Sequence, residues 1–310
     1  RGLHEAEPVE DFTALAYTVR RAFRIPGSIA MPVPINTVSD VWIPFEDEAV
    51  DFVRTPVQGD TYERYYWTGA ASPYSGVPKY STRARLLASD PPYRLGVPRP
   101  VAAPTVVPPT GVSITRAYVY TFVSAYGEEG QPSDPTLATG ASGTWNLSGI
   151  DASVPNASER NITTVRIYRT RPGLSSASFF QVDEIPIGTT TYADNVTEDE
   201  VALNPILEST IWAEPPPGLT GLTVHPGGFL VGFSGRDLYM SEPYRPHAWP
   251  VEYIITMQTE IIGLAVYNNS VVVTTNSHPY VAEGVSPSSM NPQKLDSIEP
   301  CISRRSIVTT

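Results

Sequence analysis

Two consecutive stretches of this chain repeat one pattern of short apolar strands. The first comprises residues 221–224, a turn at 225–228 and a run at 229–233. The second comprises 263–266, a turn at 267–270 and a run at 271–275, an offset of 42 residues. The identical pairs are Gly221/Gly263, Leu222/Leu264, Val224/Val266 and Val231/Val273. Repeats of about 40–45 residues built from short strands are typical of β-propeller blades. The pattern predicts stacked sheets and disfavours a nucleotide-binding α/β enzyme.

The composition agrees with short strands. The 310 residues include 32 Pro, 22 Gly and 17 Tyr, a mixture that favours strands joined by rigid turns. The length allows two or more domains. Because the chain starts without Met and stops inside an apolar run, we expect a part of a longer protein whose blades continue beyond residue 310. No apolar stretch approaches the roughly 20 residues that cross a bilayer, so no membrane-spanning segment is expected.

Charge and cysteine usage disfavour further classes. The single cysteine rules out an internal disulfide framework. A formal net charge of −11 argues against a nucleic-acid-binding module, because an acidic surface repels phosphates. The same sign suits a wall that DNA slides past without being held.

Three regions separate by composition, with boundaries at 1–105, 106–200 and 201–310. The first reads as an N-terminal arm with the first blade elements, and the third as propeller blades. Apolar residues spaced by three and four predict a helix over 10–24. Strands are expected at 41–45, 50–53 and 63–68. A proline-rich stretch at 96–112 predicts a stiff, extended linker.

The middle region reads as a small β-sandwich, because period-two strands recur every ten to twelve residues or so. These strands are expected at 116–126, 165–170, 179–182 and 191–194. The run at 118–133 resembles the penultimate strand of a fibronectin type III module and its following turn, and 165–170 resembles that family's third strand, in rotated order. Residues 64–68 with Pro73-Tyr74 echo 237–241 with Pro243-Tyr244. The predicted fold is therefore all-β, with propeller-like blades and an inserted fibronectin-III-like sandwich.

Searches for catalytic chemistry find no constellation. The four histidines lack metal-ligand spacing, and neither a nucleophile elbow nor a phosphate-cradling loop is present. Acids cluster at 46–48, 128–129 and 198–200, but adjacent acids in a turn diverge into solvent, whereas glycoside hydrolysis needs two carboxyls facing each other across a cleft. We therefore expect a non-enzyme without catalytic, cofactor-binding or metal-binding residues.

Aromatic residues are the better structural candidates. Residues 241–253 hold prolines and aromatics that fix one extended path, suited to a crossover between blades in which Trp249 and Tyr253 staple neighbouring sheets. The candidate structural or interface residues are Trp67, Trp212, Trp249 and Tyr253. The basic groups at 20–24, 83–85 and 304–305 are interpreted as solvated faces or subunit-interface pairs.

An ordered set of motifs resembles one protein family. These are Tyr-Trp-Thr-Gly followed by Pro-Tyr (66–74), Leu-Gly-Val-Pro-x-Pro (95–100), Tyr-Gly-Glu-Glu-Gly-x-x-Ser (126–133), Ile-Tyr-Arg-Thr (167–170), Ser-Glu-Pro-Tyr-x-Pro-His-Ala-Trp-Pro (241–250) and Pro-Cys-x-Ser-Arg-Arg-Ser-Ile-Val (300–308). Together they look like the tail tubular, or nozzle, proteins of tailed bacteriophages, particularly short-tailed ones. The resemblance covers most of the chain after residue 40.

The resemblance implies a structural virion protein, made in the bacterial host cytoplasm, that forms a ring-shaped nozzle and gates the DNA ejection channel. It implies a homo-hexamer with a tail adaptor protein above, tail fibres or spikes at the periphery, and viral DNA in the lumen without sequence-specific binding. No cofactor is expected. Candidate acids for the lumen are Glu46, Asp47, Glu48, Glu198, Asp199 and Glu200.

Two alternatives stay open. One is a carbohydrate-binding or carbohydrate-cleaving β-propeller, like a lectin or depolymerase, at a virion or cell surface. It would present solvent-facing aromatics and paired acids in a cleft. The other is a generic structural adhesin without a DNA channel.

Overall fold

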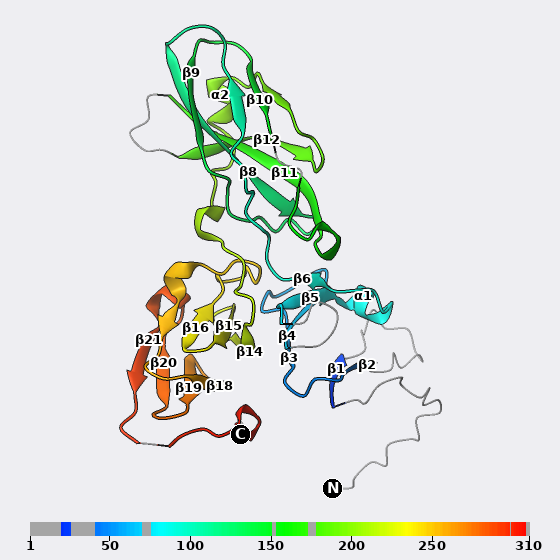
Figure 1. Cartoon of the computed structure of the whole chain (residues 1–310), viewed down its shortest axis with the longest axis vertical. Helices are drawn as coiled ribbons and strands as arrows, with labels where there is room; N and C mark the ends of the chain where they lie inside the picture. The colour runs from blue at the N-terminus through cyan, green and yellow to red at the C-terminus, as the bar shows by residue number, and fades with distance from the viewer. Residues whose placement is uncertain are drawn as a thin grey trace.

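The computed structural model describes residues 20–25, 41–69, 76–150, 153–172, 178–297 and 299–307, and shows a predominantly β chain with two lobes (Figure 1). The middle of the sequence forms the upper lobe, and the parts before and after it form the lower lobe. The described strands make open antiparallel sheets, and no closed propeller is present among them. No helix in these ranges is long and apolar enough to cross a membrane.

The lower lobe is built on three four-stranded sheets, each joining its strands in sequence order. The first holds β3 (Asp51–Arg54), β4 (Arg64–Thr68), β5 (Lys79–Thr82) and β6 (Tyr93–Arg94). The second holds β14 (Thr220–His225), β15 (Phe229–Ser234), β16 (Asp237–Met240) and β17 (Ile255–Thr256). The third holds β18 (Ile261–Tyr267), β19 (Ser270–Thr275), β20 (Tyr280–Glu283) and β21 (Asn291–Lys294). The first strands meet, because β14 lies against both β3 and β18.

Two apolar clusters hold these sheets in a row. One joins the first and second sheets and includes Tyr66, Tyr80, Leu222, Leu230 and Trp249. The other joins the second and third sheets, and the repeated valines Val231 and Val273 are both fully buried in it. Burial of this apolar surface is the main stabilising contribution at each boundary.

The 42-residue repeat corresponds to the second and third sheets, and its predicted strands are confirmed. Both first strands carry a register shift at the corresponding place, near Gly221 and Gly263. The hairpin loops differ in length. His225 pairs with Phe229 across three residues, whereas Tyr267 pairs with Ser270 across two, with Asn268 in the left-handed region at φ 51°. Asn tolerates this conformation, as two-residue hairpin turns require.

The expected echo between 64–68 and 237–241 is wrong in strand position. Residues 64–68 form β4, the second strand of its sheet, while Asp237–Met240 forms β16, the third strand. Aromatic and apolar residues occur in both strands because β4 is buried throughout and β16 is buried at alternate positions, so composition alone does not distinguish them.

The expected helix over 10–24 is wrong at its described end, and residues 10–19 lie outside the described part. Arg21–Ile25 forms β1, paired antiparallel with β2 (Val41–Phe45). Phe23 stacks on Phe52 at 5.2 Å and meets Phe45 edge-on at 5.9 Å. Pairing with β2 and this aromatic packing override the weak helical spacing.

The upper lobe consists of two packed sheets. One has the order β13 (Tyr192–Asp194), β10 (Trp145–Ser148), β7 (Thr105–Val107). The other has the order β12 (Phe179–Pro186), β11 (Ile162–Thr170), β8 (Ile114–Ser124), β9 (Thr136–Gly140). The short helices of the described chain are α1 (Arg83–Leu87), α2 (Glu198–Val201), η1 (Ala157–Glu159), η2 (Ser209–Ile211), η3 (Val251–Tyr253), η4 (Pro287–Ser289) and η5 (Arg304–Ser306). Trp145, Tyr120 and Ile167 lie in the core between the sheets.

The predicted linker at 96–112 is not a linker throughout, because its residues 105–107 form β7 and pair with β10. It begins as a buried crossing between the lobes. Leu95 belongs to the lower-lobe cluster, and Val97, two residues on, belongs to the upper-lobe core. We call residues 202–219, which lead from α2 back to β14 in the lower lobe, the returning connection. Gly96 has φ 95°, and a Cβ there would lie 2.8 Å from Cδ of Pro215 on the returning connection. The two connections therefore pack against each other.

Candidate functional site at the junction of the lobes

A buried ion pair crosses the junction. The Arg64 guanidinium on β4 donates to Glu128 Oε1 at 2.6 Å, and Glu128 belongs to the turn after β8 in the other lobe. The same guanidinium donates to Asp60 at 2.8 Å. These side chains are 3–10% exposed, so the charges are largely desolvated and depend on one another.

The turn at 127–130 fits the junction because of its glycines. Gly127 adopts φ 74°, which glycine reaches without steric cost. A Cβ on Gly130 would lie 2.6 Å from the Val97 carbonyl oxygen, so only glycine allows this approach to the crossing chain. The Ser124 amide donates to the Glu128 carbonyl at 2.8 Å and closes the turn.

His247 completes the buried junction. Its Nδ1 lies 3.9 Å from Glu128 Oε1. Burial, reinforced by the charges of Arg245 and Arg64, lowers the pKa of His247 to about 3, so the ring is neutral at physiological pH. Burial also raises the pKa of Glu128, with the Arg64 charge opposing the shift.

Further contacts surround this ion pair. Tyr62 of the lower lobe packs on Tyr126 of the upper lobe with ring centroids 4.4 Å apart. Arg160 pairs with Glu214 and donates to the Gly96 carbonyl at 2.8 Å. Both connections between the lobes are thus fixed by charge-assisted bonds, which are stronger than neutral ones.

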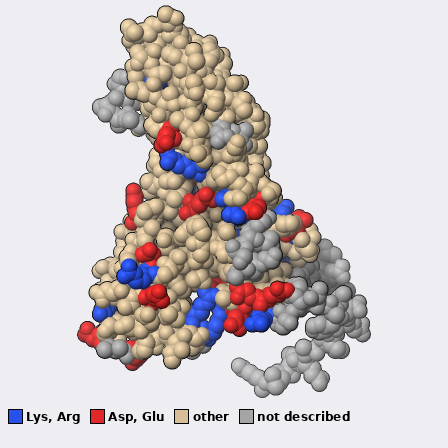
Figure 2. Space-filling view, viewed as in Figure 1, with Lys and Arg blue, Asp and Glu red and all other residues tan. Residues whose placement is uncertain are grey.

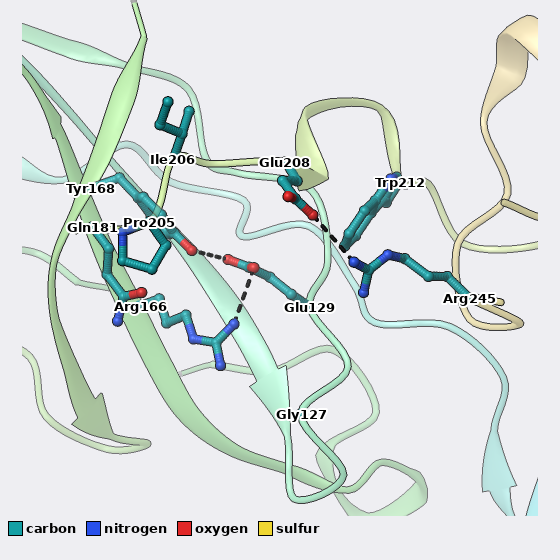
Figure 3. A pocket seen from close by; sticks show the side chains of 10 residues that line it. All are labelled: Gly127, Glu129, Arg166, Tyr168, Gln181, Pro205, Ile206, Glu208, Trp212 and Arg245. Carbon is teal, nitrogen blue, oxygen red and sulfur yellow. Dashed lines mark hydrogen bonds and ion pairs between the residues drawn. The ribbon is translucent and has the colours of Figure 1, made fainter. Parts of the chain in front are cut away.

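A pocket of about 510 Å³ opens beside this junction (Figure 3). Its lining residues are Gly127, Glu129, Arg166, Tyr168, Gln181, Pro205, Ile206, Glu208, Trp212 and Arg245. Most come from the upper lobe and the returning connection, and Arg245 reaches in from the lower lobe.

The carboxylates of the pocket are already bound. Glu129 is 7% exposed and accepts hydroxyl bonds from Tyr168 at 2.7 Å and Thr121 at 2.6 Å, while Arg166 donates at 3.2 Å. Arg245 donates to Glu208 at 3.2 Å and lies over the Trp212 ring at 4.4 Å (Figure 3). The pocket balances two acids with two arginines. This arrangement suits a rigid polar joint better than a pair of carboxyls poised for acid and base catalysis.

The prediction that the acids at 128–129 diverge into solvent is wrong. They do diverge, but into two buried networks, one centred on Arg64 and one on Arg166. Arg64 and Arg166 are both far from these acids in the sequence. The local sequence at 126–133 therefore predicts the turn but not the partners of its side chains.

Of the four candidate aromatics, the three tryptophans are buried and Tyr253 is half-buried. Trp67 is 4% exposed and lies among Phe45, Val50 and Phe52. Trp249 is 2% exposed, lies in the cluster between the first and second sheets, and donates its indole N–H to Pro246 at 2.9 Å. Tyr253 packs against the cluster between the second and third sheets, and Trp212 lines the pocket. All four contribute to contacts between elements of one chain.

The candidate acids lie in separate lobes. Glu46, Asp47 and Glu48 follow β2 in the lower lobe, where Glu46 and Glu48 are exposed and Asp47 Oδ1 accepts from the Ala49 amide at 2.7 Å. Residues 198–200 form α2 in the upper lobe (Figure 1). Within one chain these two groups do not form a continuous surface.

The acids of α2 have separate roles. Glu198 pairs with Arg116 and with Arg169, the latter at 2.7 Å. Glu200 closes a capping box with Thr197, and the bonds from the Thr197 amide and hydroxyl lower its pKa. Asp199 is exposed. Glu198 is therefore bound within the upper lobe, beside the fully buried pair Arg169–Asp194.

Comparisons with known proteins add no assignment. A scan against protein-family models and a search of curated proteins both find no match for this chain. Within the described ranges, no group of three or more His, Cys, Asp or Glu side chains is placed to hold a metal ion.

Proposed function

We propose that the chain is a structural virion protein of a tailed bacteriophage, a subunit of the ring-shaped nozzle that continues and gates the DNA ejection channel. In this proposal the three four-stranded sheets are propeller blades, and the upper lobe is an inserted fibronectin-III-like domain. In the sequence, the sandwich is inserted between β6, the last strand of the first sheet, and β14, the first strand of the second sheet.

The observation that carries the proposal is where the family-like motifs lie. The motif at 95–100 crosses between the lobes, and 126–133 supplies Glu128 and Glu129 to the junction. The motif at 241–250 supplies His247 and Trp249, and 300–308 supplies Arg304 and Arg305, which bind Asp51. These motifs place their side chains in contacts between elements, as expected of a family that shares an architecture instead of a catalytic centre.

Surface charge is compatible with this role. The net charge is −11, and the exposed Glu46 and Glu48 remain candidates for a lumen that does not retain DNA. On the face seen in Figure 2, acidic and basic side chains lie next to each other at the junction and on the lower lobe, while the upper lobe presents mostly uncharged atoms. In a ring, six copies would surround the channel, with the adaptor above and fibres or spikes outside.

Solution mass together with an enzymatic assay tests this proposal. Light scattering on the intact purified protein is expected to give a closed assembly of six copies, because head-to-tail interfaces close into rings. No release of reducing sugar from host surface polysaccharide is expected. A monomer that cleaves polysaccharide would contradict the proposal and favour the depolymerase alternative.

A further inference from the structure

Residues 299–307 cross the bottom of the lower lobe (Figure 1) and contact the first strands of its three sheets, or the residues just before them. We call residues 299–307 the strap. The Cys301 amide donates to the Thr275 carbonyl of β19 at 2.9 Å, and Cys301 is half-buried. The Ser303 hydroxyl then caps η5 by accepting from the Arg305 amide at 3.2 Å. The strap thus presents Arg304 and Arg305 from one short turn.

Both arginines bind acceptors of the first two sheets. Arg304 donates to the Ala49 carbonyl and to the Thr220 hydroxyl, and lies 3.3 Å from Asp51 Oδ2. Arg305 lies 3.1 Å from Asp51 Oδ1 and donates to the Val50 carbonyl at 3.3 Å. We call these acceptors, namely the carbonyls of Ala49 and Val50, the Asp51 carboxylate and the Thr220 hydroxyl, the acceptor notch.

The third sheet contributes space for the strap. A Cβ on Gly263 of β18 would lie 2.5 Å from Ile307 Cδ1 and 2.9 Å from Arg304 Cβ. These distances are too short for any other residue type without displacement of the strap. Arg304 therefore forms hydrogen bonds with the first and second sheets and packs against the third.

The notch is arranged for a cation. Asp51 is 15% exposed, and the Gly221 amide donates to its Oδ2 at 2.9 Å. Burial raises the pKa of Asp51, and the charge of Arg304 opposes that shift. The fork of a guanidinium matches a carboxylate and adjacent carbonyls better than an ammonium does.

The strap also spans a boundary that the apolar cores leave open. The buried clusters of the described chain join the first sheet to the second and the second to the third, but none joins the first to the third. The strap continues from the third sheet and binds the start of the first.

We propose that the acceptor notch is a binding site for an arginine-arginine segment, occupied by this chain's own strap, and that the strap acts as a latch tying the first sheet to the third. The chemistry of the notch selects paired guanidinium groups, so a competing ligand would also be an Arg-Arg peptide. This latch acts within one chain and does not depend on the ring assembly proposed above.

Amide exchange in the intact protein tests the latch. In an Arg304→Ala/Arg305→Ala variant, exchange in β3 and at the start of β14 is expected to be roughly tenfold faster or more, while exchange in the upper lobe is unchanged. A synthetic peptide of residues 299–307 added to this variant is expected to restore slow exchange. The same peptide with both arginines replaced by Ala is expected to have no effect.

Two variants serve as controls. Arg54→Ala removes a guanidinium from the same strand β3, where it lies 3.7 Å from Glu63 and 61% exposed, and is expected to leave exchange unchanged. Asp51→Asn in the double variant is expected to weaken peptide binding roughly tenfold or more. If the double variant does not fold, Arg305→Ala alone, which removes the more exposed contact, is expected to speed exchange in β3 roughly twofold. Unchanged exchange in a folded strap variant, or peptide binding that ignores Asp51→Asn, would overturn the proposal.

Discussion

At the residue scale, the guanidinium of Arg64 is shared by carboxylates from both lobes, Asp60 below and Glu128 above. Removing one member of a buried ion pair leaves the remaining charges without compensation, which costs far more than losing an exposed pair. The junction therefore depends on Arg64 more than on any rim contact such as Arg245–Glu208, whose side chains are 43% and 69% exposed.

Arg64→Met is expected to lower the free energy of unfolding by about 3–5 kcal/mol. The double variant Arg64→Met/Glu128→Gln should recover part of this loss, because one orphaned charge is removed with it. Arg99→Ala, which breaks the exposed pair with Asp134, is the matched control and should cost less than about 1 kcal/mol. Urea unfolding measures all three, and equal losses for Arg64→Met and Arg99→Ala would contradict this account of the junction.

His247 predicts a pH dependence of stability. Its pKa is about 3 in the folded chain, against about 6.5 when unfolded, so below pH 6.5 the unfolded state binds a proton that the folded state excludes. Stability is therefore expected to fall by up to about 1.4 kcal/mol per pH unit between pH 6.5 and 3 from this group. In His247→Gln, the slope of unfolding free energy against pH between 6 and 5 should decrease by the amount that corresponds to nearly one bound proton. An unchanged slope would show that His247 is not excluded from protonation.

Sequence patterns are least informative where a side chain's partner is distant along the chain. Trp67 and Trp249 are identifiable as structural, but whether they face a neighbouring subunit or their own core depends on packing that no local pattern encodes. Glu128 resembles a solvated turn residue because its partner, Arg64, lies 64 positions away. Arg304 and Arg305 resemble surface or interface charges for the same reason, since their partner Asp51 lies near the start of the chain, before the inserted upper lobe.

At the element scale, the repeated glycines mark close approaches between neighbouring segments. Gly221 adopts φ 69°, and a Cβ there would lie 2.3 Å from the Phe233 ring on β15. Its counterpart Gly263 lies under the strap instead. The two identical positions thus allow different segments to pack on equivalent strands.

Gly221→Ala is expected to destabilise the chain by about 2–4 kcal/mol, combining the strain of a left-handed Ala with overpacking against Phe233. Gly59→Ala is the control for backbone strain alone, because Gly59 has φ 70° and a Cβ there would meet nothing within 4 Å. It should cost about 1 kcal/mol. Thermal or urea unfolding separates the two, and equal costs would argue against the close approach at Gly221.

Strands are predicted well where alternation and turns are strong. The runs at 41–45, 165–170 and 229–233 fall on β2, β11 and β15. The helix expected up to residue 24 is wrong. Over a short segment the same apolar positions fit both the helical spacing of three and four and the strand spacing of two. Pairing with β2 makes the segment a strand.

At the scale of the whole molecule, the chain is a row of three sheets with a sandwich inserted after the first, and its buried charges tie these units together. The 42-residue repeat in the sequence predicts the second and third sheets. How the sheets pack, and how the two lobes are joined, depends on contacts between segments far apart in sequence. The proposed ring requires further copies of this chain to enclose a channel.

Electron microscopy of the intact purified protein tests the ring most directly. End-on class averages are expected to show six copies around a central opening. Single two-lobed particles without rotational symmetry, at concentrations where the protein is folded, would contradict the nozzle account.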